Sequence, residues 1–169
     1  MKIGIGYDAH RLVSGRPLIL GGCVVPFESG LQGHSDADVL IHAIMDAILG
    51  AAGLGDIGRH FPPEDNRHKD ACSLHMLGVV GEMIKARSLT VSNIDAVIVA
   101  ERPKLADFLP EMSQNIAETL GILKTEVNIK ATTEEGMGFT GKKEGMAAHA
   151  VVLLMGANFE RIYRQHKSK

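Results

Sequence analysis

The residues of this sequence best suited to chemistry are Asp8, His10 and His42. Asp8 and His10 are separated by one residue at the end of a predicted strand, so their side chains project to the same side. His42 would add an imidazole from a helix. Two imidazoles and one carboxylate can hold a zinc-type ion and leave a fourth position open to water or substrate. In the alternative interpretation, Asp8 and His10 cap a turn and His42 pairs with Asp46.

The segment around His42 predicts a buried helix with one polar stripe. Val39–Leu49 is apolar except for His42 and Asp46, and Asp38 comes one helical turn before His42. A helix that is apolar nearly all round is buried, and residues four apart share a face. The stripe therefore needs a polar partner or an ion. Helical side chains lean toward the N-terminus, so we expect Asp46 to reach His42 and fix its tautomer.

The start of this helix is a candidate anion site. Ser35 or Asp36 is expected to cap the helix. His34 and Ser35 then stand beside the N–H groups at the positive end of the helix dipole, where phosphate binds readily. Plain capping accounts for the same residues equally well.

A second candidate phosphate site follows a predicted strand. Thr132 and Thr133 lead through Glu135 into the glycine-rich stretch Gly136–Gly141. Hydroxyls and loop N–H groups suit phosphate oxygens, and Glu135 could hold a hard cation such as Mg²⁺. Lys104, at the exit of another strand, could contact a further phosphate. An ordinary turn and a solvated lysine are the alternatives.

The elements that would position these residues alternate between strands and helices. Strands are predicted at Lys2–Tyr7, Pro17–Leu20, Cys23–Phe27, Ile94–Ala100, Val127–Ala131 and Met146–Met155. Helices are predicted from the cap at Ser35 or Asp36 to about Gly53 or Gly55, at Ala71–Ala86 and at Phe108–Leu120. Gly21 and Gly22 indicate a hairpin turn. We expect an α/β (α+β) fold: a single-domain sandwich of a mixed β-sheet with about three helices packed on one face. The catalytic domain would span residues 1–156, followed by a polar, basic tail at 157–169.

The composition excludes several classes of function. A net charge of −2, 4% aromatic residues and the absence of Trp argue against a nucleic-acid partner. Cys23 and Cys72 match no metal or redox spacing. The first residues have no signal-peptide pattern, and no apolar run is long enough to cross a bilayer. We therefore expect a cytoplasmic protein with no membrane partner.

An ordered set of motifs resembles the 2-C-methyl-D-erythritol 2,4-cyclodiphosphate synthase family. The matching stretches are Asp8–His10, Gly33–Val39, His42, Gly55–Gly58, Arg102–Lys104, Lys130–Thr133, Glu135 and Gly138–Gly141. The resemblance implies a phosphorus–oxygen lyase of non-mevalonate isoprenoid biosynthesis. Its substrate would be the cytidine diphosphate compound 4-diphosphocytidyl-2-C-methyl-D-erythritol 2-phosphate. The 2-phosphate would attack the β-phosphorus, release CMP and close 2-C-methyl-D-erythritol 2,4-cyclodiphosphate.

The resemblance also implies roles for individual residues. Zinc would be held by Asp8, His10 and His42, and Mg²⁺ or Mn²⁺ by Glu135. His34 and Thr133 match the positions that stabilise the transition state. The implied substrate-binding residues are Asp8, His10, His34, Ser35, Asp56, Ile57, Gly58, Phe61, Pro62, Pro63, Glu64, Asp65, Ala100, Glu101, Arg102, Pro103, Lys104, Leu105, Ala106, Thr132, Thr133, Glu134, Glu135, Phe139 and Lys142.

The family resemblance implies a homotrimer with active sites between subunits. Three-fold packing would give the glycine-sided first strand and the last strand a surface to bury against. The trimer would enclose a cavity for an isoprenoid diphosphate, lined by Phe139 and Lys142. Lys142 stands where the family usually has Arg, and loses the bidentate fork. Glu101 stands where Gln is common, and we have no account of its effect.

Two other functions compete with cyclisation. The first is a zinc-dependent phosphoesterase, in which metal-bound water attacks and Asp46 or His34 acts as base. The second is a non-catalytic partner of a neighbouring pathway enzyme, or an isoprenoid-binding regulator. The presence of the three metal ligands, Thr133 and Glu135 weighs against a non-catalytic role.

Overall fold

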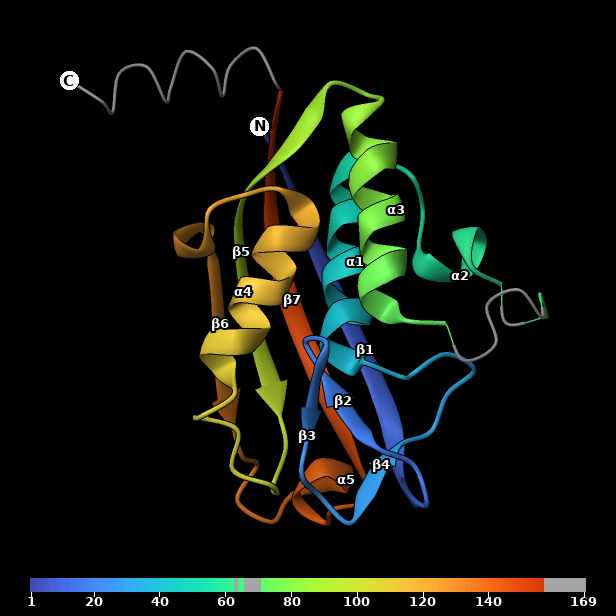
Figure 1. Ribbon diagram of the computed structural model, residues 1–169, viewed down its shortest axis with the longest axis vertical. Helices are drawn as coiled ribbons and strands as arrows, with labels where there is room; N and C mark the ends of the chain where they lie inside the picture. Colours follow the sequence, from blue (N-terminus) through green and yellow to red (C-terminus); the bar gives the residue numbers. More distant parts are fainter. Residues whose placement is uncertain (63, 66–70, 157–169) are drawn as a thin grey trace.

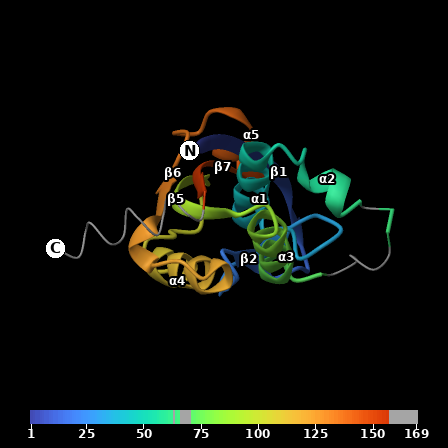
Figure 2. The ribbon, with the colours of Figure 1, turned by 90° about the horizontal axis from the view of Figure 1, so that it is seen from above.

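The computed structural model describes residues 1–62, 64–65 and 71–156 of the chain. A five-stranded mixed sheet has the order β4-β1-β7-β5-β6, and β2 and β3 form a separate hairpin. Helices α1, α3 and α4 cover one face of the sheet (Figures 1 and 2). The strands are β1 (Lys2–Ser14), β2 (Leu18–Leu20), β3 (Cys23–Val25), β4 (Ser29–Leu31), β5 (Leu89–Val99), β6 (Val127–Thr132) and β7 (Gly145–Gly156). The helices are α1 (Val39–Ala52), α2 (Ile57–His60), α3 (Ser73–Lys85), α4 (Leu109–Leu120), α5 (Gly138–Gly141) and the 3₁₀ turn η2 (Lys124–Glu126).

The predicted fold class is confirmed: a single mixed α/β unit with its longer helices on one face of the sheet. The sequence did not indicate the one-turn helices α2 and α5, because such short helices carry no periodic apolar pattern. No helix among the described residues is both long and apolar enough to span a bilayer. The predicted tail lies outside the described residues.

Strand β1 extends well beyond the predicted Lys2–Tyr7. It pairs antiparallel with β7 from Lys2 to Arg11 and then with β4 from Leu12 to Ser14. Asp8 and His10 therefore lie inside a strand rather than at its end. Pairing with a distant strand, which no local pattern reports, accounts for the added length.

The glycines of β1 allow α1 to lie directly on the sheet. A Cβ atom at Gly4 would stand 1.9 Å from the Ala47 carbonyl oxygen, and one at Gly6 would stand 1.9 Å from that of Ala43. The glycine side of β1 is therefore buried against α1 of the same chain. The residues left exposed are on the opposite face, with Ile3 at 74% and Ile5 at 73% relative exposure.

Helix α1 is the buried helix that the sequence predicted. Its residues are buried except Asp46 and Gly50, and Gly53 ends it with a left-handed φ of 72°. The N-cap is Asp38, not Ser35 or Asp36 as expected. The Asp38 carboxylate accepts hydrogen bonds from the backbone N–H of Ile41 (3.1 Å) and of Gly22 (2.8 Å), so it also holds the β2–β3 hairpin against the helix.

Candidate metal and phosphate site

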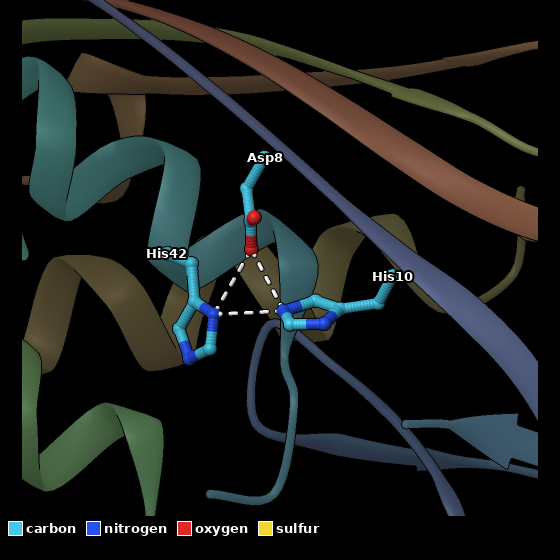
Figure 3. A group of neighbouring side chains, drawn as sticks. All are labelled: Asp8, His10 and His42. Atoms are coloured by element: carbon cyan, nitrogen blue, oxygen red, sulfur yellow. Dashed lines mark hydrogen bonds and ion pairs between the residues drawn. The ribbon is translucent and has the colours of Figure 1, made fainter. Parts of the chain in front are cut away.

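The structure brings Asp8, His10 and His42 together, from β1 and α1 (Figure 3). Asp8 Oδ2 lies 2.9 Å from His10 Nε2 and 2.9 Å from His42 Nδ1. The two ring nitrogens are 3.1 Å apart. Asp8 and His10 point toward α1 because alternate residues of β1 share the face of Gly4 and Gly6. In the part of the chain that the structure describes, this is the one cluster of His, Cys, Asp and Glu side chains with converging ligand atoms.

The electrostatics of this triad keep the carboxylate ionised. Burial acts to raise the pKa of Asp8, but hydrogen bonds and charge from His10 and His42 outweigh it and hold the pKa well below its usual range. Burial acts to lower the pKa of His10, but the hydrogen bond and charge of Asp8 raise it above its ordinary value. One carboxylate oxygen facing two imidazole nitrogens is the donor set of an open zinc site. The residues present therefore fit a divalent metal.

Asp46 does not approach His42 in the way the sequence suggested. Its Oδ1 accepts a hydrogen bond of 2.8 Å from the backbone N–H of Ile57, at the start of α2. The second nitrogen of His42, Nε2, instead lies 3.2 Å from Ser35 Oγ and 3.1 Å from Ser73 Oγ. Ser73 begins α3, and nothing in the sequence near it suggested a contact with His42.

A cavity of about 260 Å³ opens beside the triad. Its lining comprises Asp8, His10, His34, Ser35, His42, Ile57, Gly58, Phe61 and Met76. All but Met76 were singled out from the sequence. His34 Nε2 is buried with no hydrogen-bond partner in the described part of the chain. A buried polar atom without a partner beside a cavity is available to a ligand.

The loop that carries His34 is held in place by Arg16. The Arg16 guanidinium donates to the carbonyl of Gly33 (2.9 Å) and to the carbonyl of Ser35 (2.6 Å), on either side of His34. His34 and Ser35 lie in a bend before α1, and the Asp38 carboxylate accepts a hydrogen bond from the Ile41 N–H of the first turn. The structure therefore offers the His34 and Ser35 side chains to an anion, rather than a bare helix terminus.

A second cavity, of about 210 Å³, lies where the parallel strands β5 and β6 end. Its lining comprises Ala100, Glu101, Pro103, Lys104, Leu105, Ala106, Ala131, Thr132 and Thr133. The loops after neighbouring parallel strands meet at the same edge of a sheet, which brings Lys104 near the two threonines. Thr133 Oγ1 donates to Glu135 Oε1 at 3.0 Å, and the Glu134 carboxylate accepts a hydrogen bond from Thr140 Oγ1.

The other predicted residues are spread around these cavities. Asp56 caps α2 by accepting from the Arg59 N–H at 2.9 Å. Phe139, 40% exposed, lines a third hollow that also includes His10. Lys142 is exposed where α5 ends. Pro62, Glu64 and Asp65 follow Phe61 in the loop after α2, Arg102 lies in the loop after β5, and Pro63 lies outside the described residues.

Comparison with known proteins adds to this geometry. The model of the YgbB family matches residues 1–155. A protein of Clostridium perfringens named 2-C-methyl-D-erythritol 2,4-cyclodiphosphate synthase is 56% identical over 155 residues, covering 92% of this chain and 99% of that protein. A solved synthase of that name with CDP bound has a TM-score of 0.84 and 34% identity, covering 91% of this chain and 100% of the other. The bifunctional IspDF of Campylobacter jejuni has a TM-score of 0.88 and 44% identity; the match covers 90% of this chain and 42% of that one.

Proposed function

Because this chain belongs to the YgbB family, we propose that it converts 4-diphosphocytidyl-2-C-methyl-D-erythritol 2-phosphate into 2-C-methyl-D-erythritol 2,4-cyclodiphosphate and CMP. An oxygen of the 2-phosphate bonds to the β-phosphorus, and the bond from that phosphorus to the bridging oxygen of CMP breaks. The observation that best supports this proposal is the triad of Asp8, His10 and His42, in a chain 56% identical to a protein named as a synthase of this product.

The triad cavity would receive the reacting phosphates. Asp8, His10 and His42 would hold Zn²⁺, which neutralises phosphate charge and fixes the position of the phosphate oxygens. His34 supports this assignment because its Nε2 is free to meet a phosphate oxygen. Nucleophile and electrophile belong to one molecule, so holding the two phosphates in line supplies much of the catalysis. No protein nucleophile is required.

The cavity at the ends of β5 and β6 would bind the cytidine diphosphate part of the substrate. Lys104, Thr132 and Thr133 bring one positive charge and two hydroxyls to it. Glu135 would hold Mg²⁺ or Mn²⁺ at the diphosphate, and Thr133 would stabilise the transition state. A solved relative with CDP bound supports a nucleotide ligand of this kind.

We further propose a homotrimer in which active sites lie between subunits. The sheet face away from the helices exposes Ile3, Ile5, Tyr7 and Val151, which are 74%, 73%, 50% and 45% exposed. Ile5 and Val151 are direct neighbours across β1 and β7, so the apolar residues are contiguous. Such a patch indicates an interaction surface. An isoprenoid diphosphate in a central cavity near Phe139 and Lys142, and a cytoplasmic location, remain predictions.

Phosphorus NMR tests the reaction. The purified protein is incubated with the synthetic substrate, Zn²⁺ and Mg²⁺, and the products are followed by ³¹P spectra. We expect CMP together with two coupled phosphorus signals of a cyclic diphosphate. A linear phosphate product would instead indicate a phosphoesterase, and no CMP release in the presence of both metals would refute the proposal.

A further inference from the structure

We infer that Ser73 and Asp36 are positioning residues for the metal site: together they bias His42 toward the tautomer that carries its proton on Nε2, leaving the Nδ1 lone pair for the ion. This inference rests on the proposed use of the triad as a metal site. A histidine that binds metal through one nitrogen must carry its proton on the other, and the partner of that second nitrogen decides the tautomer.

The two nitrogens of His42 face different surroundings. Nδ1 points into the triad, and Nε2 points away from it (Figure 3). Nε2 lies 3.1 Å from Ser73 Oγ and 3.2 Å from Ser35 Oγ. Ser73 is fully buried, with 0% relative exposure, so no bulk water competes for this contact. The two serine hydroxyls are therefore the groups that set the protonation of Nε2.

Counting donors fixes the direction of the Ser73 contact. A serine hydroxyl has a single proton to donate. Ser73 Oγ donates that proton to Asp36 Oδ1, and the Ser73 backbone N–H donates to Asp36 Oδ2 at 2.9 Å. With its proton committed to a carboxylate, the Ser73 oxygen can only accept from His42. Nε2 must then be the protonated nitrogen for this hydrogen bond to form.

Asp36 is itself well placed to hold Ser73 in this role. Its backbone N–H donates to the Ala71 carbonyl at 3.1 Å, which joins this segment to the start of α3. The Cys72 side chain makes no capping hydrogen bond there. The Asp36 carboxylate, from outside the helix, instead accepts a hydrogen bond from the Ser73 N–H, the first of α3. A carboxylate at that end of a helix is also stabilised by the helix dipole.

Three other groups contact the same ring: His10 Nε2, which lies 3.1 Å from Nδ1, Ser35 Oγ and the Asp8 carboxylate. Ser35 Oγ accepts from the Ala37 N–H at 3.1 Å, and its own proton is free to point either way. The Asp8 carboxylate, 2.9 Å from Nδ1, favours a proton on Nδ1 when no ion is bound. Ser73 opposes Asp8. Removing the Ser73 hydroxyl should shift the tautomer balance toward Nδ1–H, the form in which the metal-binding lone pair is lost.

The test measures zinc binding and the tautomer directly, with no need for turnover. Ser73→Ala and Asp36→Asn are compared with the wild type at pH 8. Zinc affinity is taken from competition with a chromogenic chelator. The tautomer of metal-free His42 is read from long-range ¹H–¹⁵N spectra of histidine-labelled protein, assigned with His42→Gln. Ser113→Ala is the matched control, because Ser113 is a buried serine whose hydroxyl bonds the Leu109 carbonyl inside α4, away from the triad.

Ser73→Ala should weaken zinc binding about 10- to 100-fold, the usual effect of losing a partner of a metal-bound histidine. The share of the Nε2–H tautomer should fall below that of the wild type. Asp36→Asn should act in the same direction. In this variant the oxygen of the new side-chain amide must accept from the Ser73 backbone N–H. The amide NH₂ group then faces Ser73 Oγ as a donor, so the Ser73 hydroxyl proton is free to be donated to His42 Nε2. Ser113→Ala should bind zinc like the wild type.

Two results would overturn the inference. One is zinc affinity in Ser73→Ala within about twofold of the wild type. The other is weakened zinc binding with an unchanged tautomer, which would mean that Ser73 only supports the fold. If Ser73→Ala does not fold by circular dichroism, Asp36→Asn decides by the same criteria. A wild type that binds no zinc would refute the proposed metal site itself, which separates that failure from a failure of the Ser73 role.

Discussion

The close approach of α1 to β1 predicts a severe effect for Gly6→Ala. The new Cβ would lie 1.9 Å from the Ala43 carbonyl oxygen and 2.7 Å from the Ala47 nitrogen. Both are backbone atoms that cannot rotate away. Restoring a separation of 3.0 Å requires α1 and β1 to move apart by about 1.1 Å. A metal site tolerates only about 0.2 Å of error in its ligand distances, so this movement would take His42 out of the triad.

The expected magnitude follows from the packing. Overpacking a close-packed contact costs about 1–3 kcal/mol, or more when only backbone can yield. For a chain of this length each kcal/mol lowers Tm by about 2–4 °C. Gly6→Ala should therefore lower Tm by about 2–12 °C and abolish stoichiometric zinc binding. Gly50→Ala is the matched control, because a Cβ at Gly50 in α1 meets nothing within 4 Å. Alanine in a helix interior should stabilise by about 0.5–1 kcal/mol.

Thermal unfolding followed by circular dichroism measures both variants, at equal protein concentration because assembly affects Tm. Zinc content is measured on the same samples by competition with a chelator. A Gly6→Ala variant that unfolds within about 1 °C of the wild type and still binds zinc would refute the close contact of α1 with β1. A Gly50→Ala variant as damaging as Gly6→Ala would refute it as well.

Three further predictions concern the metal and the assembly. His42→Ala should lose zinc and activity together; full zinc stoichiometry in that variant, by elemental analysis, would contradict the triad assignment. Zinc affinity should fall as the pH drops through the pKa of His10: Asp8 raises this pKa, so the proton that zinc must displace is held more tightly. Calorimetry in buffers of different ionisation enthalpy should record proton release over that pH range, and a pH-independent affinity would argue against His10 as a ligand. Ile5→Glu should break the proposed trimer, because it places a charge on the apolar sheet face. Val24→Glu should not, since Val24 is 67% exposed on the separate β2–β3 hairpin. Sedimentation equilibrium that finds both variants trimeric would exclude this face as the interface.

Features with a local physical cause could be predicted from the sequence. Gly21 and Gly22 adopt φ values of 56° and 73° in the predicted hairpin, because two-residue turns of this kind need positive φ. Gly53 ends α1 for the same steric reason. The apolar circumference of α1 indicated burial. The spacing of Asp8 and His10 placed them on one side of a strand wherever that strand ended.

Other features depended on contacts between segments far apart in the chain. The length of β1 comes from pairing with β7, more than a hundred residues away, and with β4, 15 to 19 residues away. Asp38, rather than Ser35 or Asp36, is the cap of α1, because its carboxylate accepts from the Ile41 N–H and also from the Gly22 N–H of the distant β2–β3 hairpin. The partner of Asp46 is Ile57 rather than His42.

The candidate metal site also has a part that the sequence predicted and a part that depends on the tertiary structure. The residue types and the periods of strand and helix were sufficient to nominate Asp8, His10 and His42, because those periods are properties of the local backbone. Their convergence on one point, and the choice of Ser73 to face the second nitrogen of His42, depend on how α1 and α3 pack on the sheet. Ser73 carries no signal of its own in the sequence, because a buried serine acquires a role only from the side chains that the tertiary fold brings within hydrogen-bond distance.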